Sequence, residues 1–361
     1  MNFQRVAFFP VPWYHNHLKI ILKLKEDYFV KKLLLCLCMT LLLAGCAPAD
    51  PVPETDDGRL QIVATIFPAY DFARAVAGDR ADVTLLLPPG MESHSYEPTP
   101  ADILAVQNCD LFIYLGGESD AWVDTILTAA QPKGETLRMV DCVDLLEEVH
   151  VEGMQAEPGH DHDHEHEEHD HDADEPEAGH GLGEVTGMDE HVWTSPANAA
   201  DITCAIGEKL AELDASGAET YRENARAYEA ELEELDSRFE AFFDAQPSRT
   251  IVFGDRFPLL YFAERYGLDY YAAFPGCGTQ TEPSAATIAF LTEKVQAEQI
   301  STIWYIEFSN HLVADCIAEA TGTRTAMFHT CHNVTKAEME AGATYLTLME
   351  NNLETLRQNF T

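Results

Sequence analysis

The chain has 361 residues, a hydrophobic fraction of 46% and a formal net charge of −40 at pH 7. This length is enough for two ordinary domains, each with its own core. A chain this acidic is not expected to bind nucleic acid, because phosphate contacts need clusters of lysine and arginine. The charge suits a protein that attracts cations and works outside the membrane.

The N-terminal segment predicts export. Lys31-Lys32 precedes the apolar run LLLCLCMTLLLAGC, which gives the basic and apolar regions of a secretory signal. The apolar run is too short to span a bilayer comfortably. It ends in Leu43-Ala44-Gly45-Cys46, which resembles the bacterial lipobox and implies cleavage before Cys46 and a lipid anchor on its sulfur. We therefore predict a signal peptide with an overextended start over residues 1–45, and a lipidated cysteine with a linker over residues 46–59.

An N-terminal α/β lobe is predicted over residues 60–216. The run LQIVATIF ahead of Pro68 is apolar and β-rich, and it indicates a buried first strand. Further short apolar runs alternate with segments of helical period. We expect strands at 60–67, 82–87, 110–115 and 137–140, and helices at 69–77, 99–107, 122–130 and 195–211. This alternation is typical of a doubly wound parallel sheet.

A histidine-rich tract interrupts this lobe, and we predict a disordered loop over residues 152–184. Residues 159–180 read GHDHDHEHEEHDHDADEPEAGH, without lysine, arginine or any apolar residue larger than alanine. Such a segment cannot bury enough apolar surface to offset the entropy of ordering it. Alternating imidazoles and carboxylates are ligands for divalent transition metals. We expect weak, exchangeable metal binding in this loop by His160, His162, His164, His166, His169, His171 and His180.

One long helix is predicted to connect the two halves of the chain, over residues 217–247. Its apolar residues recur at steps of three and four, which indicates a continuous buried stripe. They are Tyr221, Ala225, Tyr228, Leu232, Leu235, Phe239 and Phe242. The helix itself, expected over residues 219–245, would reach about 40 Å at 1.5 Å per residue, so we expect a rigid connector.

A second α/β lobe is predicted over residues 248–361. We expect strands at 250–253, 269–273, 302–306 and 324–328, and helices at 258–266, 284–297, 312–320 and 340–358. The predicted fold is therefore α/β: two doubly wound domains joined by one long helix. Ligands in such sheets bind beyond the carboxyl ends of the strands, so we expect a metal site in the cleft between the domains.

Side chains of the metal-binding type follow strands of both lobes or lie where the tract rejoins the fold. These residues are His94, His191, Asp255, Glu307, His329, Cys331 and His332. A lone histidine in a loop is more often solvated or capping. Their joint occurrence at strand ends favours metal binding for His94, His191 and His329, whereas His332 is expected to be solvated or to support a ligand.

At these residues the chain resembles the solute-binding lipoproteins of zinc and manganese ABC transporters, over about residues 60 to 361. Pro88-Pro89-Gly90 through Tyr96-Glu97-Pro98 is similar to the first ligand loop of that family, which implies His94 as a ligand. Asp189-Glu190-His191-Val192-Trp193 is similar to the second ligand motif, which implies His191. The acidic histidine-rich insert between the two is typical of the zinc-specific branch.

The chain departs from the family pattern at the third ligand, a histidine in zinc binders or a glutamate in manganese binders. Here the string is Val252-Phe253-Gly254-Asp255-Arg256, and Gly254 has no side chain to donate. Where the family commonly has an acidic fourth ligand, this chain has His329. Our hypothesis is that His329 supplies the lost imidazole. Glu307, Asp255 or water would then complete a tetrahedral shell.

Two roles stay open for Cys331. It is either a thiolate ligand or the partner of Cys277 in a disulfide beside the cleft. The sequence does not choose among the pairings of the cysteines beyond the N-terminal segment.

Three imidazoles favour Zn²⁺ over Mn²⁺, which prefers carboxylate oxygen. We therefore expect capture of extracytoplasmic Zn²⁺ by a lipid-anchored monomer, with delivery to an ABC permease in the membrane, as the resemblance implies. An enzyme is not expected, because HExxH, GxSxG and P-loop motifs are absent from the sequence. The alternatives are a manganese-binding variant, or a storage or adhesion lipoprotein that binds metal through its tract.

Overall fold

The computed structural model describes residues 58–93, 96–117, 121–154, 187–276 and 283–360. Cys46, His94 and the tract histidines from His160 to His180 lie outside the described residues, so their predicted roles stay predictions. Residues Gly58–Thr361 form one compact unit. The predicted lobe boundaries also remain predictions. Among the described helices, none combines the length and apolar character that crossing a membrane requires.

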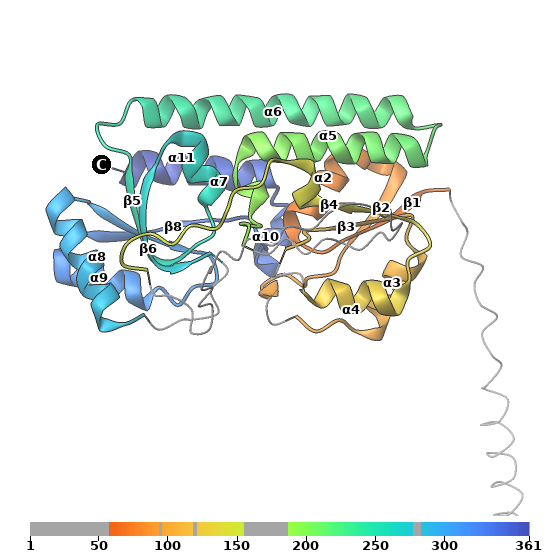
Figure 1. The fold of residues 1–361 in the computed structure, drawn as a ribbon. Helices are drawn as coiled ribbons and strands as arrows, with labels where there is room; N and C mark the ends of the chain where they lie inside the picture. Colours follow the sequence, from red (N-terminus) through yellow and green to blue (C-terminus); the bar gives the residue numbers. More distant parts are fainter. Residues whose placement is uncertain (1–57, 94–95, 118–120, 155–186, 277–282, 361) are drawn as a thin grey trace, which may run out of the picture. The chain divides into compact units, whose positions relative to one another are not determined.

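The first sheet has four parallel strands in the order β2-β1-β3-β4. Helices α3 and α4 cover one face, and α2 and α5 cover the other (Figure 1). The strands are β1 (Leu60–Ala64), β2 (Ala81–Leu85), β3 (Leu111–Tyr114) and β4 (Glu135–Arg138), and the helices are α2 (Phe67–Ala77), α3 (Pro100–Asn108), α4 (Ala121–Ala130) and α5 (Pro196–Leu213). The predicted strand at 137–140 stops at Arg138, because the chain turns into a short 3₁₀ segment, Met139–Cys142.

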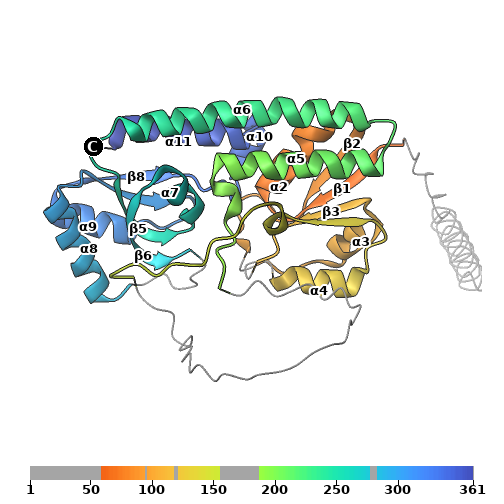
Figure 2. The same cartoon turned by 45° about the horizontal axis from the view of Figure 1, so that its top comes forward.

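The second sheet also has four parallel strands, in the order β6-β5-β7-β8. Its strands are β5 (Thr250–Phe257), β6 (Asp269–Pro275), β7 (Thr302–Ile306) and β8 (Arg324–Phe328). Helices α8 (Ala285–Glu298) and α9 (Leu312–Thr321) pack on one face. On the other face lie α7 (Leu260–Tyr266) and α11 (Tyr345–Asn359) (Figure 2). Parallel strands buried on both faces account for their near-continuous apolar sequences.

The predicted single helix at 340–358 is wrong. The chain forms α10 (Lys336–Ala341) and then α11, separated by a turn at Gly342. Gly342 has φ +76°, a left-handed conformation that ends α10, and Thr344 then caps α11 by accepting a hydrogen bond from the backbone N–H of Thr347. After this break, α11 begins beside α2, where the backbone N–H of Tyr345 donates a hydrogen bond to the carboxylate of Asp71 at 2.8 Å.

Helix α6 (Ala218–Asp244) has 27 residues and packs against helices that follow both sheets. Near its start, Asn224 donates a hydrogen bond to the carbonyl of Val76 in α2 at 2.9 Å. Near its end, Arg238 pairs with Glu350 of α11 at 2.7 Å. Its buried stripe follows the predicted period, except that Tyr228 and Phe242 are half-buried and Phe243 is buried.

Candidate metal centre

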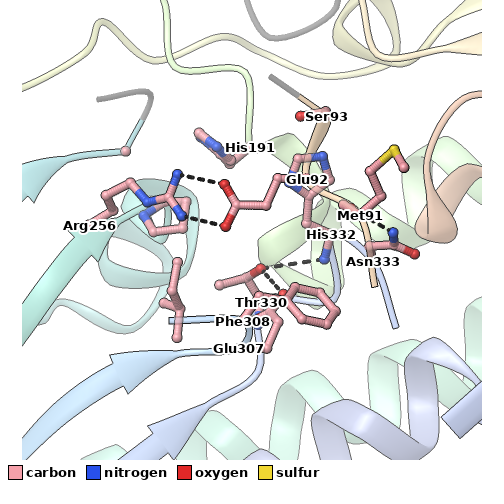
Figure 3. Close-up of a pocket in the computed structure, with 13 residues that line it drawn as sticks. Met91, Glu92, Ser93, His191, Arg256, Glu307, Phe308, Thr330, His332 and Asn333 are labelled. Carbon is pink, nitrogen blue, oxygen red and sulfur yellow. Dashed lines mark hydrogen bonds and ion pairs between the residues drawn. The ribbon is translucent and has the colours of Figure 1, made fainter. Parts of the chain in front are cut away.

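A small pocket lies where the carboxyl ends of the strands of both sheets meet. It has a volume of about 40 Å³, room for an ion and a few ordered ligand atoms. Polar and charged side chains from both halves of the chain line it (Figure 3). They include Glu92, Ser93, His191, Arg256, Glu307, Thr330, His332 and Asn333. The position agrees with the rule that open α/β sheets bind ligands beyond the carboxyl ends of their strands.

His191 is the one residue of the second ligand motif that lines this pocket. Its side chain is buried, and its Nδ1 lies 3.1 Å from Oδ1 of Asp189. The same oxygen accepts the backbone N–H of His191 at 2.8 Å, so one carboxylate fixes both the ring and the backbone. Nε2 is the ring nitrogen left for a ligand. A carboxylate behind a histidine is the usual support of a metal-bound imidazole.

The electrostatics around His191 are strongly acidic. Burial by itself would lower the pKa of His191, but the charges of Asp189 and Glu190 and the hydrogen bond to Asp189 raise it above its ordinary value. Asp189 and Glu190 are themselves buried. Gly117 is what permits Glu190 to lie there, because a Cβ at Gly117 would come within 1.8 Å of a carboxylate oxygen of Glu190. The site thus concentrates negative charge behind an imidazole, which favours a cation.

His332 lines the same pocket as His191, and the rings of both histidines lie close to the indole of Trp193. The ring centroid of Trp193 is 5.5 Å from that of His191 and 5.3 Å from that of His332. The indole is fully buried and donates its N–H to the carbonyl of Thr330 at 2.8 Å. Two imidazoles from distant parts of the chain are therefore packed against one rigid aromatic ring beside one pocket.

The loop that carries His332 is held in an unusual conformation. Cys331 has φ +62°, which is uncommon for a residue with a side chain and costs backbone strain. The amide of Asn333 donates to the carbonyls of Pro88 and Met91, both at 2.8 Å, and so ties this loop to the loop after β2. Strain of this kind is retained where the surroundings over-determine the conformation, which is common at ligand sites.

Glu307 also lines the pocket, as the residue directly after β7. Its two oxygens accept hydrogen bonds from the backbone N–H of Thr330 at 2.7 Å and from the hydroxyl of Thr330 at 2.5 Å. The carboxylate is buried and thus oriented by the loop after β8. Its lone pairs are partly occupied, and it can still offer charge to a cation in the pocket.

His329 is not among the residues that line the pocket. Its Nδ1 accepts the backbone N–H of Cys331 at 2.9 Å, and its nearest carboxylates are those of Glu307 and Glu338, each at 3.8 Å. Asn352 in α11 brackets its backbone, accepting from its N–H and donating to its carbonyl. His332, rather than His329, therefore lines the same pocket as His191.

Cys331 and Asp255 are buried but do not line the pocket. Burial raises the pKa of the Cys331 thiol well above its ordinary value, with Glu307 adding to the effect, so a thiolate is disfavoured there. Cys331 is a free thiol, and Cys277 lies outside the described residues. Asp255 is engaged by the backbone, accepting from Arg256 at 2.8 Å and from Ile306 at 3.3 Å.

The prediction for the third-ligand position is changed by the geometry of β5. Gly254 faces helix α9, because a Cβ built on it would lie 2.5 Å from the Cα of Ala314. The strand continues to Phe257 with a register shift between Phe253 and Arg256, and Arg256 is the β5 residue that lines the pocket. At the third-ligand position of the family, strand β5 therefore presents the guanidinium of Arg256 to the pocket instead of a metal ligand.

Replacing Gly254 with alanine is expected to destabilise the protein by about 1–3 kcal/mol, the usual cost of forcing an extra carbon into a packed interior. The reason is the contact with the backbone of α9. The check is the midpoint of urea unfolding followed by circular dichroism, at unchanged slope. A midpoint equal to that of the parent protein would show that Gly254 has room beside Ala314.

Among the residues that the structure describes, no group of three His, Cys, Asp or Glu side chains is close enough together to hold a metal ion. His94, the third histidine expected in the cleft, falls in the gap at 94–95. Its sequence neighbour Ser93 lines the pocket.

Comparisons with known proteins agree with the fold. The family described as zinc-uptake complex component A, periplasmic, matches residues 62–359. The zinc-binding lipoprotein AdcA of Streptococcus pneumoniae (strain ATCC BAA-255 / R6) is 32% identical over 330 residues, which are 91% of this chain and 60% of that protein. The high-affinity zinc uptake system protein ZnuA of Bacillus subtilis (strain 168) is 30% identical over 327 residues, 88% of this chain and 94% of that protein.

The Zn(II)-bound ZnuA-like domain of Streptococcus pneumoniae AdcA has the same fold, with a TM-score of 0.64, 29% identity and coverage of 84% of this chain and 99% of that one. The predicted α/β fold with two parallel sheets is thereby confirmed. The family consists of solute-binding components for zinc uptake. Because this role is not enzymatic, the prediction that the protein is not an enzyme is confirmed. This chain, which spans about 60% of the length of AdcA, belongs to the family of periplasmic zinc-uptake complex A components.

Proposed function

We propose that this protein captures extracytoplasmic Zn²⁺ and delivers it to an ABC permease in the membrane. The observation that carries the proposal is the packing of the His191 and His332 rings against the same buried Trp193, beside one pocket. Imidazole nitrogen is a preferred zinc ligand, whereas Mn²⁺ favours carboxylate and water oxygen. The zinc-binding names of the relatives AdcA and ZnuA support the choice of ion.

The proposed ligands are His191, His332 and His94, with Glu307 as a source of further negative charge. His94 enters on the sequence pattern of its loop. Asp189 acts behind His191, orienting the ring through the 3.1 Å contact at Nδ1. His332 takes the place that our sequence hypothesis gave to His329, because His332 lines the pocket.

The sequence and the names of the relatives support a proposed location and anchor. The proposed lipid on Cys46 would hold the protein at the outer face of the cell membrane, near the permease. The lipoprotein name of the Streptococcus pneumoniae relative supports this. The tract histidines would collect zinc weakly, because imidazoles on a segment without fixed geometry cannot form a single tight site.

Removing residues 157–180 tests whether the pocket or the tract holds the ion. The shortened protein is expected to bind about one Zn²⁺ tightly, since a closed site of about four ligands binds one ion. The measurement is a titration against a chromophoric zinc chelator, repeated with Mn²⁺ as competitor. Loss of tight binding would support metal storage by the tract, and preference for Mn²⁺ would support the manganese-binding variant.

A further inference from the structure

An ion pair crosses the proposed zinc pocket. The guanidinium of Arg256, on β5, contacts both carboxylate oxygens of Glu92, on the loop after β2, at 3.0 and 3.3 Å (Figure 3). Both side chains line the pocket. The pair therefore joins a strand of the second sheet to a loop that follows a strand of the first, at the place where a cation is proposed to bind.

The charge of Arg256 is unfavourable for a divalent cation in the same pocket. Its side chain is only 15% exposed, so water and salt screen it weakly. A guanidinium has no lone pair to offer and cannot lose its proton in a protein. Whatever Arg256 contributes to a zinc pocket, it is not a ligand, and its charge has to be neutralised.

The carboxylate of Glu92 can bind either the guanidinium of Arg256 or a zinc ion. A carboxylate accepts two-pronged hydrogen bonds from arginine, and it is also a regular zinc ligand through oxygen. The side chain of Glu92 is 39% exposed, whereas that of Glu307 is 6% exposed and bonded to Thr330. Of these two carboxylates in the pocket, Glu92 is the more exposed.

We propose that Glu92 is a further zinc-binding residue, whose carboxylate is shared between Arg256 and the ion. Arg256 holds Glu92 when the pocket contains no metal, and the carboxylate turns to Zn²⁺ when the ion reaches His191 and His332. Arg256 and Zn²⁺ then compete for one carboxylate, so Arg256 weakens zinc binding and favours release. This inference rests on the proposed zinc function and adds a residue that sets its affinity.

The test is a zinc competition titration of the full chain with a high-affinity chelator. The chelator outcompetes the weak zinc sites of the protein, so the titration reports the tight site alone. Arg256→Gln is expected to raise the affinity about tenfold, because the competing charge is gone. Glu92→Gln is expected to lower it about tenfold or more, the range seen when a group supporting a metal site is lost. The decisive variant combines both changes.

In the Arg256→Gln background, Glu92→Gln is still expected to lower the affinity about tenfold, because a ligand is lost whether or not Arg256 is present. An affinity equal to that of Arg256→Gln alone would overturn the proposal, since Glu92 would then only neutralise Arg256. Changes within about twofold in all three variants would also overturn it and would leave a purely structural ion pair. Arg256→Lys, which keeps the charge but loses the two-pronged contact, is expected to change the affinity less than Arg256→Gln.

Glu97→Gln is the matched control, because Glu97 lies on the same loop, is exposed and does not line the pocket. Its affinity is expected to stay within about twofold of the parent, as for an exposed charge screened by solvent. A loss equal to that of Glu92→Gln would overturn the proposal in favour of a general charge effect. Absence of tight zinc binding in the parent protein would contradict the proposed function itself, whereas tight binding with the wrong order of variants would contradict only the role of Glu92.

Discussion

Replacing His332 with alanine is expected to lower the affinity for Zn²⁺ by about 100-fold or more. Losing a group that merely supports a ligand costs about 10–100-fold, and losing the ligand should cost at least as much. His332 lines the pocket, and its ring lies 5.3 Å from that of Trp193, the indole that also packs against His191. The measurement is a competition titration with a chromophoric chelator on protein lacking residues 157–180.

His329→Ala is the matched control for this prediction. His329 lies three residues earlier in the same loop, is buried, and does not line the pocket. Its removal is expected to change the zinc affinity by less than about threefold while lowering the thermal midpoint, because a buried hydrogen-bonded side chain is lost. The reverse order, with His329→Ala losing zinc and His332→Ala keeping it, would restore the original hypothesis for His329.

Replacing His191 with alanine is the second change expected to remove tight binding, again by about 100-fold or more, because a direct ligand is lost. Asp189→Asn should have a smaller effect of about 10–100-fold, since it weakens the support of the ring without removing the imidazole. Isothermal titration with Zn²⁺ in the presence of a competing chelator gives both affinities.

His311→Ala is the control for His191. The side chain of His311 is exposed, its Nδ1 lies 2.8 Å from a carboxylate oxygen of Asp315, and it does not line the pocket. Its zinc affinity is expected to match that of the parent. Equal affinities for His191→Ala and His311→Ala would remove the second ligand motif from the site.

Much of the fold could be predicted from the sequence, because apolar period and turn residues act locally. Strands β7 and β8 begin and end where they were expected, and α6 differs from the helix expected at 219–245 by one residue at each end. One final helix was predicted where the chain forms two, α10 and α11, because the apolar period continues across Gly342. Gly342 adopts the left-handed backbone conformation that ends α10.

The general position of the site was also predictable, since the carboxyl ends of parallel strands gather candidate ligands at one edge. The choice between His329 and His332 was not, because it depends on the left-handed backbone at Cys331, which decides how the loop turns after β8. A cysteine gives no local signal for such a conformation. The string HTCHN contains both histidines, but its sequence does not show which of them lines the pocket.

Arg256 was not recognised as a member of the pocket for a related reason. The strand predicted to stop at Phe253 continues to Phe257, and the register shift on the way determines which side chains reach the pocket. Register shifts of this kind depend on neighbouring strands and on the contact of Gly254 with α9, which are tertiary interactions.

The central claim is that His191 and His332 hold one zinc ion beside Trp193. Diffraction data collected on both sides of the zinc absorption edge, from crystals of the zinc-loaded protein lacking residues 157–180, test it most directly. The account predicts one anomalous peak at about 2.0–2.1 Å from a ring nitrogen of each of these two histidines, the usual zinc–imidazole distance. A peak bonded to His329 and not to His332 would contradict it.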